Sequence, residues 1–252
     1  MQGAGRLLME VTAVTHRGRV RAHNEDTIVV DGWTCGESMD TPRRSVHDIA
    51  GATLVLVADG MGGHVGGREA SRRAARALVR LAPDSACPTE VAGALRAVNR
   101  ELFAAVDHEP TLRGMGTTVA GIVAMRDRTV WFNVGDSRVY SVRQGFVRQL
   151  SVDDVPAWAA SGSGRITQAL GGADAYLEID PHVGSESTRP GRRYLLCSDG
   201  LTDAVPLETI ERALSDDARS RVGGLLESAL AAGAPDNVSI VLAAVRTADG
   251  DG

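Results

Sequence analysis

Apolar residues recur along the chain at two spacings, and their alternation predicts the secondary structure. Residues 7–15 form an apolar-rich run that predicts a strand, and residues 27–31 predict its hairpin partner after a turn at Gly18. Apolar positions at helical spacing predict helices over residues 68–81 and 89–106. The same patterns predict further strands over 52–58, 117–125, 129–134, 137–142, 146–150, 177–183, 193–198 and 238–246, and further helices over 206–214 and 218–232.

The connections between these elements indicate the fold class. Short links between the strands from residue 117 to residue 150 predict an antiparallel meander, whereas residues 32–51 predict a long polar loop. Two helices, a block of strands, two more helices and a final strand are typical of a layered α+β architecture. No segment has the composition of a linker, so we expect residues 1–252 to form a single domain.

The composition of the chain excludes some classes of binding partner and some reaction types. The formal net charge of −5 gives no general attraction to nucleic acid or to an anionic membrane, so we expect neither as a partner. All 27 basic residues are arginine, which excludes a Schiff-base lysine and a P-loop lysine. We interpret the arginine row on the predicted helix 68–81 as a solvated face, with an anionic partner as the alternative.

Cysteine usage and apolar runs predict a cytoplasmic protein. Cys35, Cys87 and Cys197 lie far apart in the sequence and match neither a disulfide framework nor a zinc motif. Cys197 stands within an apolar run, so we expect it in the core and not as a nucleophile. No run reaches the roughly 18 apolar residues of a membrane helix, and residues 1–10 lack the apolar segment of a signal peptide.

The most informative stretch is residues 52–64. The apolar run 52–58 predicts a buried strand that ends in Asp59, and the glycines that follow allow the backbone to approach a ligand closely. Three more acidic segments stand at strand ends or turns: Asn24-Glu-Asp26, Ser198-Asp-Gly-Leu-Thr-Asp203 and Pro235-Asp-Asn237.

Convergence of these acidic segments would make a site of oxygen ligands only. Such ligands suit Mg²⁺ or Mn²⁺ better than zinc. Carboxylates gathered without a cation repel one another and raise one another's pKa, so convergence implies bound metal. Taken singly, each segment has a plainer interpretation as a turn, a helix cap or a solvated acidic pair.

Six motifs appear in a fixed order: Arg21-x-x-Asn-Glu-Asp26, Asp59-Gly-Met-Gly-Gly-His64, Gly114-Met-Gly-Thr-Thr118, Asn133-Val-Gly-Asp-Ser-Arg138, Ser198-Asp-Gly-Leu-Thr-Asp203 and Asp236-Asn237. Together they closely resemble the bacterial metal-dependent protein phosphatases of the type-2C or PPM family, which favours the metal site over the plainer interpretations. The resemblance runs from about residue 8 to residue 246. It implies an α-β-β-α sandwich in which two antiparallel sheets pack face to face, helices cover both outer faces, and metal ions bind at one end between the sheets.

The resemblance implies two metal ions, Mn²⁺ or Mg²⁺, and a set of ligands for them. Asp59 would bridge the two ions, with the Gly60 carbonyl completing the shell of one. Asp199 and Asp236 would bind the other ion directly. A water activated by both ions would then attack phosphorus in line with the leaving group.

Other residues would support this centre. Glu25 and Asp26 would act mainly through metal-bound waters, and Arg21 would clamp the phosphoryl oxygens with its planar, bidentate group. Asp136 and Asp203 match positions that hold a third, weaker metal in bacterial relatives. The alternative for Asp136 is a turn cap at Gly135 that pairs with Arg138.

The resemblance implies a monomeric serine/threonine protein phosphatase whose partners are phosphorylated proteins. One alternative is a catalytically silent binding module. Such a module would be expected to lack Asp59, Asp199 or Asp236, and all three are present. Another is a narrow regulatory phosphatase that acts on a phosphorylated anti-sigma antagonist. For His64, a hydrogen bond within the glycine-rich turn is favoured over a general-acid role.

The chain departs from the family where the substrate approaches. Asp153-Asp154 replaces the usual Asp-His pair, residues 155–165 form a shortened flap, and Gln168 stands where relatives have arginine. We therefore expect weak discrimination among phosphopeptides, with the loop 32–51 as a substitute recognition element.

Overall fold

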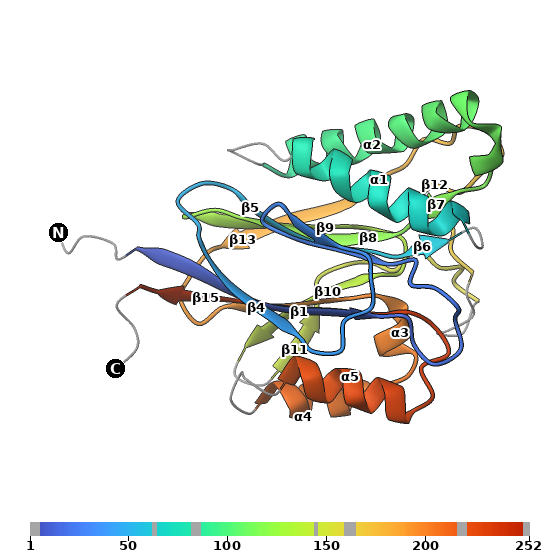
Figure 1. The fold of residues 1–252 in the computed structure, drawn as a ribbon. Coiled ribbons are helices and arrows are strands. Elements are labelled where there is room, and N and C mark those ends of the chain that lie inside the picture. The colour runs from blue at the N-terminus through green and yellow to red at the C-terminus, as the bar shows by residue number, and fades with distance from the viewer. Residues whose placement is uncertain are drawn as a thin grey trace.

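Two six-stranded antiparallel sheets lie face to face, and helices cover the outer face of each (Figure 1). The computed structural model describes residues 6–61, 65–81, 87–143, 146–158, 165–215 and 221–248. The predicted α+β, four-layer α-β-β-α sandwich is confirmed.

The first sheet joins the two ends of the chain. β1 and β15 are antiparallel from the Leu7–Thr247 pair to the His16–Val238 pair. In spatial order its strands are β11 (Phe146–Gln149), β10 (Arg138–Arg143), β14 (Arg193–Cys197), β15 (Val238–Thr247), β1 (Leu7–His16) and β4 (Arg43–Asp48).

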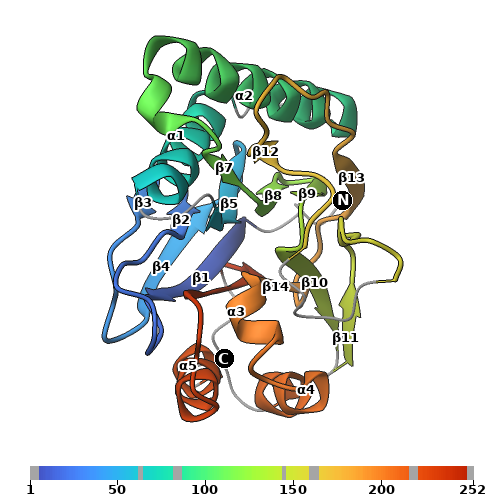
Figure 2. The same ribbon diagram turned by 90° about the vertical axis from the view of Figure 1, so that its right-hand side faces the viewer.

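The second sheet is built from the middle of the chain, and a small three-stranded sheet adjoins the helices beside it (Figure 2). In spatial order the second sheet contains β13 (His182–Ser187), β9 (Arg128–Val134), β8 (Val119–Ala124), β5 (Thr53–Ala58), β2 (Thr27–Val30) and β3 (Trp33–Cys35). The small sheet contains β12 (Leu170–Gly171), β7 (Gly116–Thr117) and β6 (Gly60–Met61).

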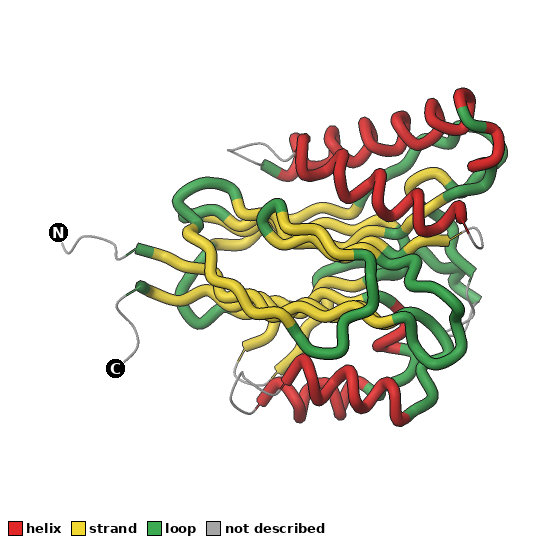
Figure 3. Tube along the Cα trace, viewed as in Figure 1, coloured by secondary structure: helices red, strands yellow, loops and turns green. Residues whose placement is uncertain are grey.

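The helices divide between the two outer faces (Figure 3). α1 (Val65–Leu81) and α2 (Pro88–His108) cover the second sheet, and a 3₁₀ turn, η1 (Pro110–Leu112), follows α2. α4 (Leu207–Ser215) and α5 (Arg221–Ala231) cover the first sheet, next to the short α3 (Asp199–Thr202). In the part of the chain that is described, no helix is long and apolar enough to cross a membrane.

Three apolar layers hold the sandwich together. One lies between α1–α2 and the second sheet, with Leu56, Leu95 and Phe132 buried in it. Another fills the space between the sheets, and the third packs α3–α5 against the first sheet. Cys197 is buried in this third layer, as predicted, and burial raises the pKa of its thiol to about 12.

Three sequence-based expectations about the strands are wrong. Residues 27–31 do not pair with 7–15, because β2 pairs with β3 and β5 in the other sheet. The loop 32–51 contains the edge strands β3 and β4, whose polar, largely exposed residues hide a strand pattern. The strand predicted at 177–183 begins at His182.

The predicted meander is split between the sheets. β8 pairs with β9 in the second sheet and β10 pairs with β11 in the first, so the chain crosses the sandwich between residues 134 and 138. The segment between β1 and β2 makes a similar crossing. Both crossings carry residues of the predicted metal site.

Candidate metal and phosphate site

Strand register gathers the acidic segments at one end of the sandwich. In the second sheet Thr27 is opposite Ala58, so Asp26 and Asp59 leave the sheet at the same edge. In the first sheet Cys197 is opposite Ile240, which brings Asp199 close to the segment that precedes β15.

Backbone contacts position Asp59 and Gly60. The Asp59 carbonyl accepts hydrogen bonds from the Thr118 backbone N–H (2.9 Å) and from the Thr117 Oγ1 hydroxyl (2.8 Å). A Cβ atom on Gly60 would lie 2.3 Å from the Gly67 carbonyl oxygen and 2.5 Å from that of Glu25. Only glycine fits at this approach, which brings the start of α1 against the acidic segment around Glu25.

The Asn237 side chain ties the segment after β1 to the start of β15. Its amide nitrogen donates to the carbonyl oxygens of Arg17 (2.9 Å) and His23 (3.0 Å). Its Oδ1 accepts a hydrogen bond from the Glu25 backbone N–H at 2.8 Å. Arg21, in the same segment, pairs with Asp236 through an Nη2–Oδ2 distance of 2.6 Å.

Asp26 is fully buried and held by a chain of hydroxyl groups. Its Oδ2 accepts a hydrogen bond from Ser239 Oγ at 2.6 Å. Ser239 Oγ in turn lies 2.7 Å from Thr15 Oγ1, which accepts from the Asn24 amide at 2.8 Å. The two sheets are therefore joined by polar contacts directly beneath the site.

These elements form a pocket of about 210 Å³. Most of the predicted site residues line it, together with Met61, Thr118 and Ile166. Asp26 lies behind the pocket wall, and Asp203 is exposed at the end of α3. The predicted residues that line it are Arg21, Glu25, Asp59, Gly60, Asp136, Asp199 and Asp236.

The carboxyl groups raise one another's pKa. Burial raises the pKa of Asp26 and of Asp136 to about 6, and burial together with Asp136 and Asp236 raises the pKa of Asp199 to about 7. The pKa of Asp59 is raised well above its usual range, first by burial and then by Asp26 and Asp199. This pocket is therefore short of positive charge.

Two orphaned oxygens support the fit of a cation. Among the described residues, Asp26 Oδ1 and Asp199 Oδ1 are buried without a hydrogen-bond partner. An unsatisfied buried polar atom costs about 1–3 kcal/mol, which a bound divalent cation would offset. No three acidic, histidine or cysteine side chains of the described chain already converge on one ion position.

Arg138 has a different partner from the one considered in the sequence. Its Nε and Nη2 atoms donate to Asp153 Oδ2 at 2.9 and 2.7 Å, whereas no ion pair joins it to Asp136 among the described residues. The Asp136 carboxylate therefore remains available at the pocket. Asp203 raises the pKa of both Asp136 and Asp199, which indicates that it lies near them.

Sequence reasoning missed several contributors to the site. Ile166 lines the pocket but stands in an irregular segment without a motif. The hydroxyl chain of Thr15 and Ser239 depends on contacts between opposite ends of the sequence. His64 and residues 159–164 of the flap lie outside the described residues.

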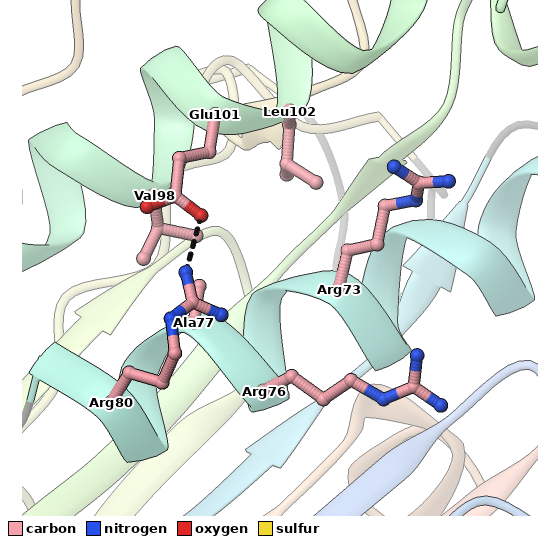
Figure 4. A pocket seen from close by; sticks show the side chains of 7 residues that line it. All are labelled: Arg73, Arg76, Ala77, Arg80, Val98, Glu101 and Leu102. Carbon is pink, nitrogen blue, oxygen red and sulfur yellow. Dashed lines mark hydrogen bonds and ion pairs between the residues drawn. The ribbon is translucent and has the colours of Figure 1, made fainter.

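Arg73, Arg76 and Arg80 of the arginine row on α1 line a separate hollow between α1 and α2 (Figure 4). Arg80 pairs there with Glu101 at 2.8 Å, and Arg73 pairs with Glu69 at 2.5 Å. Arg68 and Arg72 both pair with Glu37. These ion pairs agree with the interpretation of a solvated helix face.

Comparison with known proteins identifies relatives along most of the chain. A sequence model of the family described as Protein phosphatase 2C matches residues 40–235. The serine/threonine protein phosphatase PstP of Mycobacterium tuberculosis is 36% identical over 257 residues, which cover 95% of this chain and 45% of that protein. The chain thus spans about half the length of this relative. The serine/threonine phosphatase stp of Listeria monocytogenes is 30% identical, with 90% of this chain and 92% of that protein covered.

Solved structures agree with these relationships. The catalytic domain of PstP in complex with two manganese ions superposes with a TM-score of 0.76 at 36% identity, covering 95% of this chain and 99% of that one. PppA of Pseudomonas aeruginosa superposes with a TM-score of 0.75 at 28% identity, covering 95% and 97%. The sandwich is therefore that of the PPM-type phosphatases. The chain belongs to the protein phosphatase 2C family.

Proposed function

We propose that this chain is a Mn²⁺- or Mg²⁺-dependent protein phosphatase that hydrolyses phosphoserine and phosphothreonine. The observation that carries the proposal is the pocket in which Arg21 faces five acidic side chains. The orphaned oxygens of Asp26 and Asp199 support bound metal, as does the manganese in the PstP structure.

The oxygen donors have distinct roles. Asp59, which follows β5 of the second sheet, and the Gly60 carbonyl of the small sheet would hold ions from one side, and Asp199 and Asp236 would hold them from the side of the first sheet. Bound divalent ions lower the pKa of a bound water and stabilise the charge of the phosphoryl group. The two sheets keep these donors at fixed positions, because each follows or precedes a buried strand.

Arg21 binds the phosphoryl group of the substrate. Its side chain is half exposed, with 52% of its surface accessible, and it lines the pocket beside Asp236. A planar guanidinium can donate two parallel hydrogen bonds to phosphoryl oxygens, which orients the phosphorus for attack.

The remaining acidic residues adjust the centre. Glu25 and Asp26 would orient water near the ions, Asp26 from its position beneath the pocket. Asp136 and Asp203 hold a third, weaker ion. The proximity of Asp203 to Asp136, which the raised pKa of Asp136 indicates, supports this pairing.

We also propose that residues 1–252 act as a single, monomeric phosphatase domain in the cytoplasm. Its partners are phosphorylated proteins, with neither nucleic acid nor membrane required. The net charge of −5 and the three free cysteines support this context.

Phosphate release from a phosphothreonine peptide in Mn²⁺ tests the proposal. Asp59→Asn is the matched inactive control, since it removes a charge with little change in volume. Turnover by the wild type and none by the variant is expected. Tight, Mn²⁺-dependent peptide binding without turnover would instead favour the silent binding module. Turnover confined to one anti-sigma antagonist would favour the narrow regulatory phosphatase.

A further inference from the structure

A second hollow, of about 270 Å³, adjoins the acidic pocket. Met61 and Ile166 line both, so the two spaces share part of their walls. The hollow is smaller than the roughly 300–1,000 Å³ of a site for a drug-sized ligand, and it suits one side chain of a longer substrate.

Hydrogen bonds fix one wall of this hollow to the catalytic end of the sandwich. The Thr167 backbone N–H donates to the Asp154 carbonyl at 2.7 Å, and Gln168 Nε2 donates to Asp154 Oδ2 at 3.0 Å. Asp154 Oδ2 also accepts from the Gly135 N–H at 2.8 Å, next to Asp136. These hydrogen bonds connect this wall to residues 134–138, the segment that carries Asp136.

The opposite wall is fixed to α2. Asn99 is fully buried, accepts a hydrogen bond from the Gly171 N–H at 2.9 Å and donates to the Leu177 carbonyl at 2.8 Å. The Gly172 N–H donates to the Met115 carbonyl at 2.8 Å. Because both walls are held by the core, the hollow exists before a ligand arrives, which limits the ordering cost of binding.

Most side chains of the lining are apolar, although polar atoms make up about half of its exposed surface. Met61, Ile166, Ala169 and Leu177 offer apolar side chains that an apolar occupant could contact. The Gln168 side chain already uses both ends of its amide, because it also forms hydrogen bonds with the backbone of Asp180 at 2.5 and 3.1 Å.

Charge in the hollow disfavours an acidic occupant. Glu178 is the one ionisable side chain among the lining residues that the structure describes. An acidic side chain would meet this like charge without a basic partner and would lose hydration.

We propose that this hollow is a specificity subsite that binds an apolar side chain adjacent to the phosphorylated residue of a peptide substrate. The inference rests on the proposed phosphatase function. Consecutive Cα atoms are 3.8 Å apart, so a residue within one or two positions of the phosphorylated one reaches a contiguous hollow. The shortened flap alone predicts weak discrimination among phosphopeptides. With this subsite, we expect the enzyme to prefer peptides that have an apolar residue next to the phosphorylated one.

Matched phosphothreonine peptides test the subsite. Each position within two residues of the phosphothreonine is varied among Leu, Gly and Asp, and kcat/KM is measured in Mn²⁺. At one of these positions we expect a preference for Leu over Gly of roughly tenfold, with Asp below Gly.

Leu177→Glu should reduce the Leu-to-Gly ratio toward one, because it places a second carboxylate at the hollow. Its side chain is 63% exposed, so folding should be retained. Ala173→Phe, which fills the hollow, should reduce the ratio without adding charge. Leu207→Glu is the control, since Leu207 is an exposed leucine of α4 on the other sheet.

The outcomes separate the subsite from the proposed function. Turnover of all peptides with ratios within about twofold at every position would overturn the subsite and leave the phosphatase standing. A preference that survives Leu177→Glu and Ala173→Phe would place recognition elsewhere. No hydrolysis of any peptide by the wild type would overturn both.

Discussion

At the residue scale, Asp59 and Asp236 are the two carboxylates whose loss should matter most. Asp59→Asn or Asp236→Asn should lower kcat by at least about a hundredfold, because each removes a charged ligand that stabilises the transition state through bound metal. Steady-state kinetics on an aryl phosphate in saturating Mn²⁺ measures this loss.

The Asp203→Asn variant tests whether Asp203 has a different role from the ligands of the two tighter Mn²⁺ sites. It should lower turnover by about tenfold and leave the two tighter Mn²⁺ sites intact, since Asp203 is exposed at the end of α3. Isothermal titration with Mn²⁺ counts the sites. Loss of all Mn²⁺ binding in Asp203→Asn would show that this division of roles is wrong.

Arg21→Ala should raise KM for phosphopeptides by about tenfold, with a smaller change in kcat, if the guanidinium binds ground and transition states alike. Arg21→Lys, which keeps the charge but loses the planar fork, should restore part of the loss. An unchanged KM in Arg21→Ala would remove this side chain from the phosphate site.

The sequence identified most of the residues that meet in the pocket, but not how they are held. The order of motifs pointed to Asp59, Asp199 and Asp236, all of which line the pocket. The partner of Arg138 was not predictable, because Asp136 is much nearer in sequence than Asp153 and only the tertiary fold selects Asp153. Ile166 was not predictable either, since a lone isoleucine in a loop has no periodicity.

At the element scale, two glycines with opposite surroundings test the close packing of α3 against β15. A Cβ atom on Gly200 would lie 1.9 Å from the Asn237 carbonyl oxygen, whereas one on Gly93 of α2 meets nothing within 4 Å. Gly200→Ala should destabilise the fold by about 1–3 kcal/mol, and Gly93→Ala should stabilise it by about 0.5–1 kcal/mol. Urea denaturation measures both, and a neutral Gly200→Ala would refute the close approach.

Strand positions were more predictable than strand partners. The apolar runs of β1, β5, β14 and β15 were identified within one or two residues, because buried strands have continuous apolar sequences. Their pairing was not, since β1 meets a partner at the far end of the chain. β4 (Arg43–Asp48) was missed because it is an edge strand with mostly polar, solvent-exposed residues. It therefore lacks the apolar positions from which a strand is predicted.

At the scale of the whole molecule, the acidic pocket is a source of instability that metal should remove. Burial and mutual repulsion raise the pKa of Asp59 and Asp199, which makes their charged forms unfavourable in the fold. Mn²⁺ at a hundred times its Kd should stabilise the native state by about 2.7 kcal/mol. For a chain of this size the melting temperature should rise by about 5–10 °C.

Asp59→Asn serves as the control for this thermal shift. It should melt at a similar or higher temperature than the wild type in chelator, because one of the repelling charges is gone. Its shift in Mn²⁺ should be much smaller than that of the wild type. Equal shifts in the two proteins would mean that the stabilising ion binds elsewhere.

The central claim is that turnover depends on divalent ions held by the acidic pocket. Phosphate release from a phosphothreonine peptide, followed through addition of excess chelator and then of excess Mn²⁺, tests it most directly. We predict that release stops in chelator and returns with Mn²⁺ in the wild type, with no recovery in Asp59→Asn. Undiminished phosphate release in excess chelator would contradict the claim.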